Sequence, residues 1–461
     1  YRILGTDLEK VDILIHGCAI LPMNNKEVIA DGAIVIKNGE IIFVGKRTAV
    51  GNVRAEKQIN AKGKVALPGL VNSHTHVSMT LFRGLAEDKL LNVWLKDVIW
   101  PLEAKLTSDE IRAGALLGCL EMIKSGTTCF ADMYFHEEVV AEAVKESGLR
   151  AVLAEGIIEA GNKALGEKML ENSVKFAEKF EGYAEGRVRV MLGPHAAYSC
   201  SPELLVKVRK KAEKLKIGIH THLAESKEIF KDSEDNSCSE VEFLNRLDFF
   251  KGHFLAAHCI NLSKRDMRIL AEHHVNVAYV PVANMKLGLG AARIRELASL
   301  NINVALGTDG PASNNTLDIL ETMKVGALLQ KLIYLNPEVL PAYDVLKMAT
   351  INGAKALGLE SSIGSLEKGK KADIILINLS KPHLKPLHDI YATIVYSARG
   401  SDVDTVIVDG KILMENRLVK TLKEEKVVEN AEKHATDLLS RNVTQKLLEQ
   451  KKRNNRLSLK D

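Results

Sequence analysis

Paired cysteines and long apolar runs are both missing from this sequence of 461 residues. Its six cysteines are scattered singly, with no Cys-x-x-Cys pair. This spacing disfavours a disulfide framework or a structural zinc site and suits a reducing compartment. No uninterrupted apolar run reaches the length needed to span a bilayer. We therefore expect a cytoplasmic protein without a secretion signal or a membrane anchor.

An excess of charge of one sign is also missing. The 63 basic and 59 acidic residues nearly balance and are mixed along most of the chain. Nucleic-acid binders concentrate positive charge in a patch or stripe, so we expect no nucleic-acid partner. Hydrophobic residues make up 46% of the sequence, which is enough for a large buried core.

Both ends of the chain show short apolar runs separated by tight-turn signals. Asn38-Gly39 and Asp409-Gly410 each lie between two such runs, which strongly favours a β-hairpin. We therefore expect residues 1–65 and 363–420 to build one small β-sandwich together. Residues 421–461 are rich in Lys, Glu and Asn, which predicts a charged helix or a frayed tail.

Between these ends, apolar runs alternate with helical segments. Eight such runs recur between residues 64 and 310, among them "TTCFADM", "RVRVMLGPH" and "NVALGTDG". Apolar strands that alternate with helices predict a parallel sheet. Eight of them in about 250 residues match the size of a closed (β/α)8 barrel. The predicted fold class is therefore α/β, with a TIM-like barrel over residues 66–362.

Polar side chains gather where several of these strands should end. Residues two apart in a strand face the same side, so His74 and His76 can both face the mouth of the barrel. Other runs place the following residues at the same edge: His195, His220, His222, Glu225, His258 and Asp309. A single histidine there is usually structural, but this many indicate a metal site or catalysis, because barrel enzymes carry their active sites at that edge.

Imidazoles combined with a carboxylate indicate which cation the site would take. Such a set suits Zn²⁺, with Fe²⁺, Ni²⁺ or Co²⁺ as alternatives. Three or four protein ligands with water in the open position describe a hydrolytic centre, where the cation lowers the pKa of bound water to about 7. The expected cofactor is therefore one divalent metal ion, with Zn²⁺ preferred.

The segments "PGLVNSHTHVSMTLFRGL", "HLAES", "AAHC" and "LGTDGPASNN" together resemble the amidohydrolase superfamily, and within it the 5'-methylthioadenosine/S-adenosylhomocysteine deaminases. The resemblance covers residues 11–412. The motif His-x-His alone is a weak signal, whereas all of these motifs in this order are a specific one. It implies one metal ion held by His74, His76, His222 and Asp309. The fourth strand contains no lysine that could bridge two metals, which agrees with a single ion.

The chemistry of such a site suggests roles for three residues. Asp309 can accept a proton from the attacking water and pass it to the leaving amine. Glu225 can protonate a ring nitrogen, and His258 can stabilise the attacking oxygen. This set predicts conversion of the 6-amino group of an adenosine analogue to a 6-oxo group with release of ammonia. Alternatively, Glu225 starts a surface helix in "AESKE".

Substrate contacts are implied by the resemblance. Glu103 would bind the ribose hydroxyls, His195 would contact the nucleoside and Trp94 would line the pocket, while Glu225 and Asp309 would also touch the substrate. By residue type alone, Trp94 is more often part of a core.

The expected substrates are 5'-methylthioadenosine, 5'-deoxyadenosine and adenosine, with S-adenosylhomocysteine as a further candidate. Relatives that hold its carboxylate use arginines after strand three, whereas "AEGIIEAGNKALGEKM" offers Glu155 and Glu159 and no arginine. This segment favours an uncharged 5'-group, unless a lysine there or a distant residue such as Arg150 binds the carboxylate. A homo-oligomer is also expected.

Three other functions are compatible with parts of the sequence. One is a different hydrolase on the same scaffold, such as an s-triazine chlorohydrolase or a guanine or cytosine deaminase. Another is a scaffold without catalysis, which should have lost ligands, although none is lost here. The third is a sugar- or phosphate-handling barrel, for which "GTDGPASNN" offers glycines but also the acidic residue Asp309.

Overall fold

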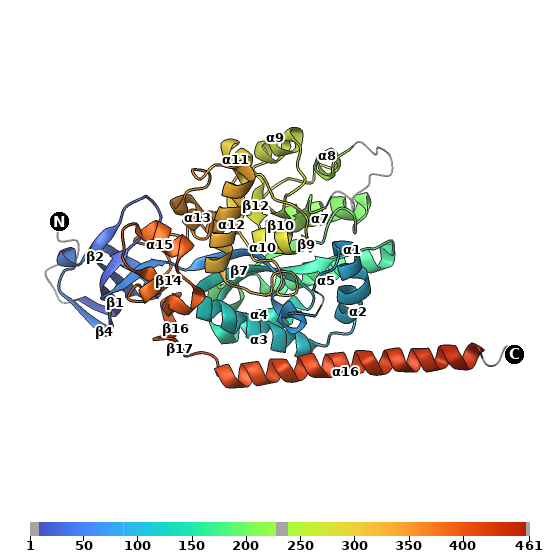
Figure 1. Ribbon diagram of the computed structural model, residues 1–461. Helices are drawn as coiled ribbons and strands as arrows, with labels where there is room; N and C mark the ends of the chain where they lie inside the picture. Colours follow the sequence, from blue (N-terminus) through green and yellow to red (C-terminus); the bar gives the residue numbers. More distant parts are fainter. Residues whose placement is uncertain (1–8, 86, 227–237, 458–461) are drawn as a thin grey trace.

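The computed structural model describes residues 9–85, 87–226 and 238–457. It consists of a barrel, a sheet beside the barrel and a long C-terminal helix that runs along one side (Figure 1). Among the described residues, no helix is both long and apolar enough to cross a membrane.

The barrel contains the eight predicted parallel strands. They follow one another around the sheet in chain order, and each strand pairs with the next. Their bounds are β6 (Leu70–Thr75), β7 (Thr127–Tyr134), β8 (Arg150–Ile157), β9 (Val188–Pro194), β10 (Gly218–Leu223), β11 (Phe254–His258), β12 (Asn276–Tyr279) and β13 (Val304–Leu306). The expectation of a (β/α)8 barrel is confirmed.

Helices cover the outside of the barrel (Figure 1). The longer ones are α3 (Ser108–Ser125), α4 (Glu137–Ser147), α5 (Lys163–Phe180), α7 (Pro202–Leu215), α9 (Lys264–Glu272) and α12 (Ile319–Tyr334). Local sequence fixes where several helices begin. At α3, Thr107 accepts a hydrogen bond from the backbone of Glu110, whose side chain accepts one from the Thr107 backbone. This capping box satisfies two amides that would otherwise lack partners.

The barrel closes where its first strand meets its last. The side-chain oxygen of Asn72 accepts a hydrogen bond from the Thr308 amide at 3.0 Å, and its amide group donates to the Thr308 hydroxyl at 2.7 Å. The amide of Asp309, the residue after Thr308, donates to the carbonyl of His74 at 3.0 Å. Closure therefore brings the histidine of β6 next to the aspartate that follows β13.

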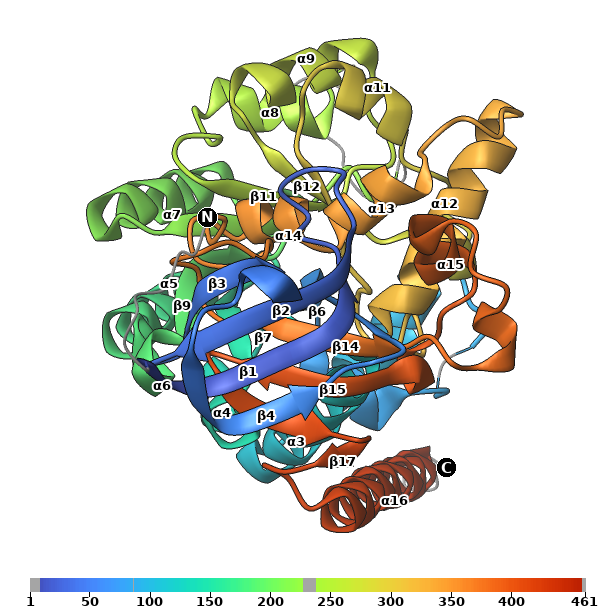
Figure 2. The same cartoon turned by 90° about the vertical axis from the view of Figure 1, so that its left-hand side faces the viewer.

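Both chain ends contribute to the second sheet, as expected (Figure 2). Its strands are β1 (Glu9–Ile20), β2 (Ile29–Lys37), β3 (Glu40–Lys46), β4 (Val53–Asn60), β5 (Lys64–Pro68), β14 (Ile374–Asn378), β15 (Val403–Val408), β16 (Lys411–Glu415) and β17 (Leu418–Val419). All of them are hydrogen-bonded into one sheet, with β5 between β1 and β14.

The two predicted hairpin turns are present in this sheet. Asn38 and Gly39 connect β2 to β3 with φ angles of 52° and 78°, and Asp409 and Gly410 connect β15 to β16 with φ angles of 50° and 74°. Positive φ at both central residues is the geometry of a type I′ turn, which matches the twist of the flanking strands.

The predicted C-terminal helix is α16 (Glu424–Leu457). Its first half packs on the barrel, where Val427, Ala431 and Leu438 are buried. Arg441 forms an ion pair with Glu110 of α3. The last residues of the predicted tail, 458–461, lie outside the described part of the chain.

A buried ion pair joins the barrel to the sheet. Arg150, the first residue of β8, donates to both carboxylate oxygens of Asp373 at 2.9 and 3.1 Å. Asp373 also accepts a hydrogen bond from the Asp409 amide at 2.8 Å. The idea that Arg150 binds a substrate carboxylate is therefore wrong, because its side chain is paired at the end of β8 away from the mouth.

We predict that Arg150→Ala lowers the free energy of unfolding by about 3–5 kcal/mol, because it leaves the Asp373 carboxylate buried without its partner. Urea unfolding followed by circular dichroism measures the loss. Arg189→Ala is the matched control, since Arg189 pairs with Glu181 at the surface and should contribute less than about 1 kcal/mol. Equal losses in the two variants would contradict the structural role of the buried pair.

Candidate metal and substrate site

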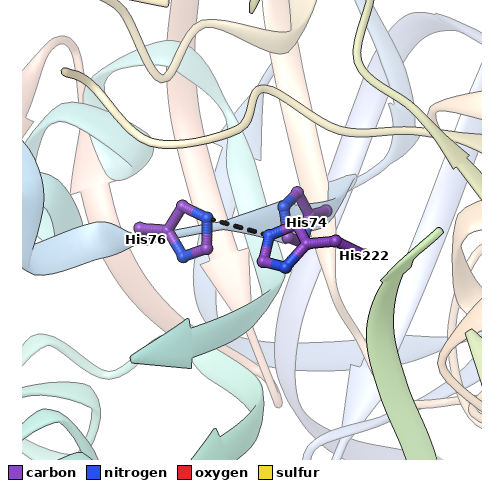
Figure 3. A group of neighbouring side chains, drawn as sticks. All are labelled: His74, His76 and His222. Atoms are coloured by element: carbon purple, nitrogen blue, oxygen red, sulfur yellow. Dashed lines mark hydrogen bonds between the residues drawn. The ribbon is translucent and has the colours of Figure 1, made fainter. Parts of the chain in front are cut away.

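Three histidines that lie on or just after two barrel strands face one another (Figure 3). The Nε2 atoms of His76 and His222 lie 3.3 Å apart. Oδ1 of Asp309 lies 3.2 Å from Nε2 of His76 and 3.5 Å from Nε2 of His74. The four residues assigned as ligands thus direct their side chains to one point.

The donor set fits a divalent cation. Nε2 of His74 is buried and has no hydrogen-bond partner, although buried polar atoms are normally paired. Ligand atoms of His74, His76 and His222 all lie within 4.8 Å of one another, and so do those of His74, His258 and Asp309. Imidazole nitrogen and carboxylate oxygen are ligands that Zn²⁺ accepts.

The opposite ring nitrogen of each histidine is held by a neighbour. The Nδ1 contacts are His74 to Nε2 of His220 at 2.8 Å, His76 to the carbonyl of Met133 at 2.6 Å and His222 to the carbonyl of His195 at 2.8 Å. Contacts of this kind fix the tautomer and the orientation of a metal-binding ring. They leave Nε2 of each ring facing the shared point.

The electrostatics of the site favour a cation. Burial lowers the pKa of His74 to about 4, so this ring is neutral and able to bind a metal at neutral pH. Burial opposes ionisation of Asp309, but its close contacts with His74 and His76 bring the pKa of this carboxyl well below its usual range. Burial also opposes the charge of His76, yet its contact with Asp309 raises the pKa of His76 to about 9. A bound cation would therefore displace a proton from His76.

Two further polar side chains lie beside the convergent ligands. Nε2 of His258 lies 3.7 Å from Oε1 of Glu225, and its Nδ1 contacts Oδ1 of Asn284 at 3.0 Å. Burial raises the pKa of Glu225, which favours the protonated form that can donate a proton. His258 and Asp309 have φ angles of 72° and 63°, a strained conformation that is common at functional sites.

His76, His222 and Asp309 line one cavity together with their neighbours. The substrate residues expected from the sequence, Trp94, Glu103, His195, Glu225 and Asp309, all line it. Trp94 is 6% exposed, so it is both buried and part of the cavity wall.

Several other cavity residues were not predicted. Tyr134 is the last residue of β7 and Phe135 follows it. Tyr198 packs its ring edge-on against His195 with centroids 5.6 Å apart. Ile158 and Leu287 add apolar surface. The aromatic residues directly after "TTCFADM" and "GPHAA" were the available signal, because those positions follow strand ends.

The expectation that Glu155 and Glu159 face the substrate is wrong. Glu155 accepts hydrogen bonds from the amides of His136 and Glu137, and Glu159 accepts one from the Ser201 hydroxyl at 2.6 Å. Neither carboxylate lines the cavity. Both side chains are used to hold the loops and helices around the barrel.

The histidines and the aspartate meet at the ends of the barrel strands, and this arrangement is typical of metal-binding (β/α)8 barrels. The amidohydrolase family model matches residues 65–413, and the chain belongs to this family. A 5'-deoxyadenosine deaminase of Methanosarcina mazei is 48% identical over 93% of this chain and 99% of its own. A 5-methylthioadenosine/S-adenosylhomocysteine deaminase of Desulforamulus reducens is 44% identical over 92% of this chain and 99% of its own.

A solved structure is also similar. The crystal structure of an adenosine deaminase from Xanthomonas campestris with bound zinc has a TM-score of 0.90 and 30% sequence identity, covering 94% of this chain and 100% of its own. The family and this fold agree with the resemblance inferred from the motifs.

We predict that His76→Ala binds almost no metal, because it removes one of the side chains that meet at the shared point. Elemental analysis of the purified protein measures this. His136→Ala is the control, since that histidine is exposed and pairs with Glu138 away from the cavity, and it should keep its metal. Full metal occupancy and unchanged activity in His76→Ala would overturn the ligand assignment.

Proposed function

We propose that the protein is a metal-dependent hydrolase that removes the 6-amino group of adenosine analogues and releases ammonia. The observation that carries this proposal is the meeting of the convergent ligands with Glu225, His258 and Glu103 in one cavity. The names of the relatives, which include a 5'-deoxyadenosine deaminase, support the same reaction.

His74, His76, His222 and Asp309 would hold one divalent cation. Zn²⁺ is the preferred ion, and the zinc bound in the Xanthomonas adenosine deaminase supports this choice. The cation, when bound, supplies the Lewis acidity that makes water a nucleophile at neutral pH.

Proton transfers belong to two carboxyl groups. Asp309 accepts a proton from the attacking water and later returns it to the leaving amine. Glu225 donates a proton to the purine ring nitrogen beside the attacked carbon, so the electron pair that arrives on the ring is neutralised. The burial that raises the pKa of Glu225 keeps this proton available.

His258 stabilises the attacking oxygen. Its Nδ1 is fixed by Asn284, which leaves Nε2 directed toward Glu225 and the cavity. With Nδ1 donating to Oδ1 of Asn284, Nε2 of the neutral ring accepts a hydrogen bond from the attacking water and orients it. In the protonated ring, Nε2 donates to the tetrahedral oxygen, and this bond strengthens as negative charge develops there.

The remaining cavity residues would hold the nucleoside. Glu103 binds the ribose hydroxyls, His195 contacts the nucleoside and Trp94 lines the pocket beside them. Burial lowers the pKa of His195 to about 3, so its ring is neutral toward the substrate.

The chain would be organised as residues 1–65 and 363–420 in the terminal sheet, 66–362 in the catalytic barrel and 421–461 in the tail. We place the enzyme in the cytoplasm as a homo-oligomer. All six cysteines are buried and form no disulfide among the described residues, which supports a reducing compartment.

An adenosine-analogue panel tests the function directly. The zinc-loaded enzyme should release ammonia from 5'-deoxyadenosine, 5'-methylthioadenosine and adenosine, and not from guanine, cytosine or an s-triazine. Chloride release from a chloro-s-triazine alone, or ammonia release from guanine or cytosine alone, would replace the proposal with the corresponding hydrolase.

We predict that Glu225→Gln keeps its metal but loses at least about 10²-fold in kcat, because an amide fills the site without supplying a proton. Elemental analysis and steady-state kinetics on 5'-deoxyadenosine measure the two quantities. Glu203→Gln, at an exposed position on α7, is the control and should behave as wild type. Turnover of Glu225→Gln within about threefold of wild type would assign the proton transfer to another group.

We also predict that kcat/KM for 5'-deoxyadenosine or 5'-methylthioadenosine exceeds that for S-adenosylhomocysteine by about tenfold, or about 1.4 kcal/mol. The reason is that no lysine or arginine among the described residues lines the catalytic cavity, so a carboxylate there would lose its water without gaining a partner. Kinetics with the substrates side by side measure the ratio. Equal efficiencies would show that the carboxylate finds a strong partner.

A further inference from the structure

The catalytic cavity adjoins a second, larger space. This outer chamber is open to solvent. Five side chains line both spaces and form a collar between them: Leu91, Leu95, Trp100, Tyr198 and Leu287. Most of the collar comes from the excursion after β6, which contains α1 (Leu91–Val93), η3 (Trp94–Ile99) and α2 (Trp100–Glu103).

The collar lies where the 5' end of a bound nucleoside would point. In the proposed binding mode, the purine amino group lies at the metal ligands and the ribose lies at Glu103. Glu103 and Trp100 are three residues apart on α2, and residues at this spacing share one face of a helix. The ribose would therefore lie next to the collar, and a long 5'-substituent would pass between its apolar side chains.

The two spaces differ in charge. Neither lysine nor arginine lines the catalytic cavity, whereas Lys96 lines the outer chamber. Lys96 is exposed and forms no ion pair with any carboxylate of the described residues, and no described aspartate or glutamate lines the chamber. The described lining of the outer chamber therefore carries one positive charge and no negative charge.

We propose that the outer chamber is the subsite for the far end of an extended 5'-substituent, and that Lys96 pairs with a carboxylate carried there. The ligand class is an adenosine 5'-thioether whose tail ends in a carboxylate, such as an amino acid. This inference rests on the proposed deaminase function. In this proposal the excursion after β6 binds the substrate carboxylate, a role that residues 154–169 after strand three do not fill.

The contact between Lys96 and a substrate carboxylate should be weak because Lys96 is exposed to water. An exposed lysine in water gains little from pairing with one carboxylate, and its single ammonium lacks the bidentate fork of an arginine. Lys96 therefore makes acidic tails acceptable without making them preferred, in agreement with the expected preference for small uncharged 5'-groups.

A matched pair of substrates isolates the charge of the tail. S-Adenosylhomocysteine carries the carboxylate, and 5'-deoxy-5'-butylthioadenosine is a neutral thioether of similar length. The ratio of their kcat/KM values is measured for the zinc-loaded wild type, Lys96→Met and Lys96→Glu. Lys89→Met is the control, since Lys89 is an exposed lysine of the same excursion that lines neither space.

We expect the ratio to fall about threefold in Lys96→Met and about tenfold or more in Lys96→Glu, while Lys89→Met keeps the wild-type ratio. Added salt should lower the wild-type ratio and leave that of Lys96→Met unchanged, because salt screens exposed charge pairs. Activity on 5'-deoxyadenosine should be the same in all four proteins.

Two results would overturn the inference. One is an unchanged ratio in both Lys96 variants, and the other is a wild type on which S-adenosylhomocysteine is neither a substrate nor a competitive inhibitor. Absence of ammonia release from every analogue, 5'-deoxyadenosine included, would instead overturn the proposed function. Calorimetric titration of S-adenosylhomocysteine into wild type and Lys96→Glu would then still decide whether the lysine binds the tail.

Discussion

Closure of the barrel between β6 and β13 is the constraint on which the site depends. Gly307 lies so close to β6 that a Cβ atom there would stand 2.9 Å from the amide nitrogen of His74. With no side chain at Gly307, Asn72 can bind Thr308, and Asp309 can reach the carbonyl of His74. The carboxylate arrives beside the imidazoles because the two strands are joined there. Any larger residue at 307 would separate these elements.

The barrel and the gathering of polar side chains at its mouth could be predicted from the sequence because both follow from regular geometry. A parallel strand buried on both faces needs a continuous apolar run, and all eight runs are strands. Residues at the ends of such strands converge at the mouth, and His74, His76, His222 and Asp309 lie together there. The choice of these four as metal ligands came from the resemblance to the amidohydrolase superfamily. Hairpin turns are equally local, since their Asn-Gly and Asp-Gly pairs select the turn by themselves.

Side-chain direction outside the strands could not be predicted, because it depends on partners that are distant in sequence. Glu155 turns to the amides of His136 and Glu137, and Arg150 turns to Asp373, 223 residues away. No local pattern distinguishes these residues from ones that face a substrate. The same applies to Lys96, whose place beside the catalytic cavity results from how the excursion after β6 folds over the mouth.

The groups proposed for the reaction and the groups proposed for the choice of substrate lie on different parts of the chain. The proposed metal ligands and acid-base groups stand on or just after barrel strands, where backbone hydrogen bonds fix them to within a narrow range. The collar and Lys96 stand mainly on the excursion after β6, which can change without moving a strand. A substitution at Lys96 should therefore alter which 5'-groups are accepted and leave the chemistry at the purine ring intact. A substitution at Gly307 should instead impair the chemistry at the purine ring and leave the preference among 5'-groups unchanged. The reason is that it disturbs barrel closure and therefore affects every substrate equally.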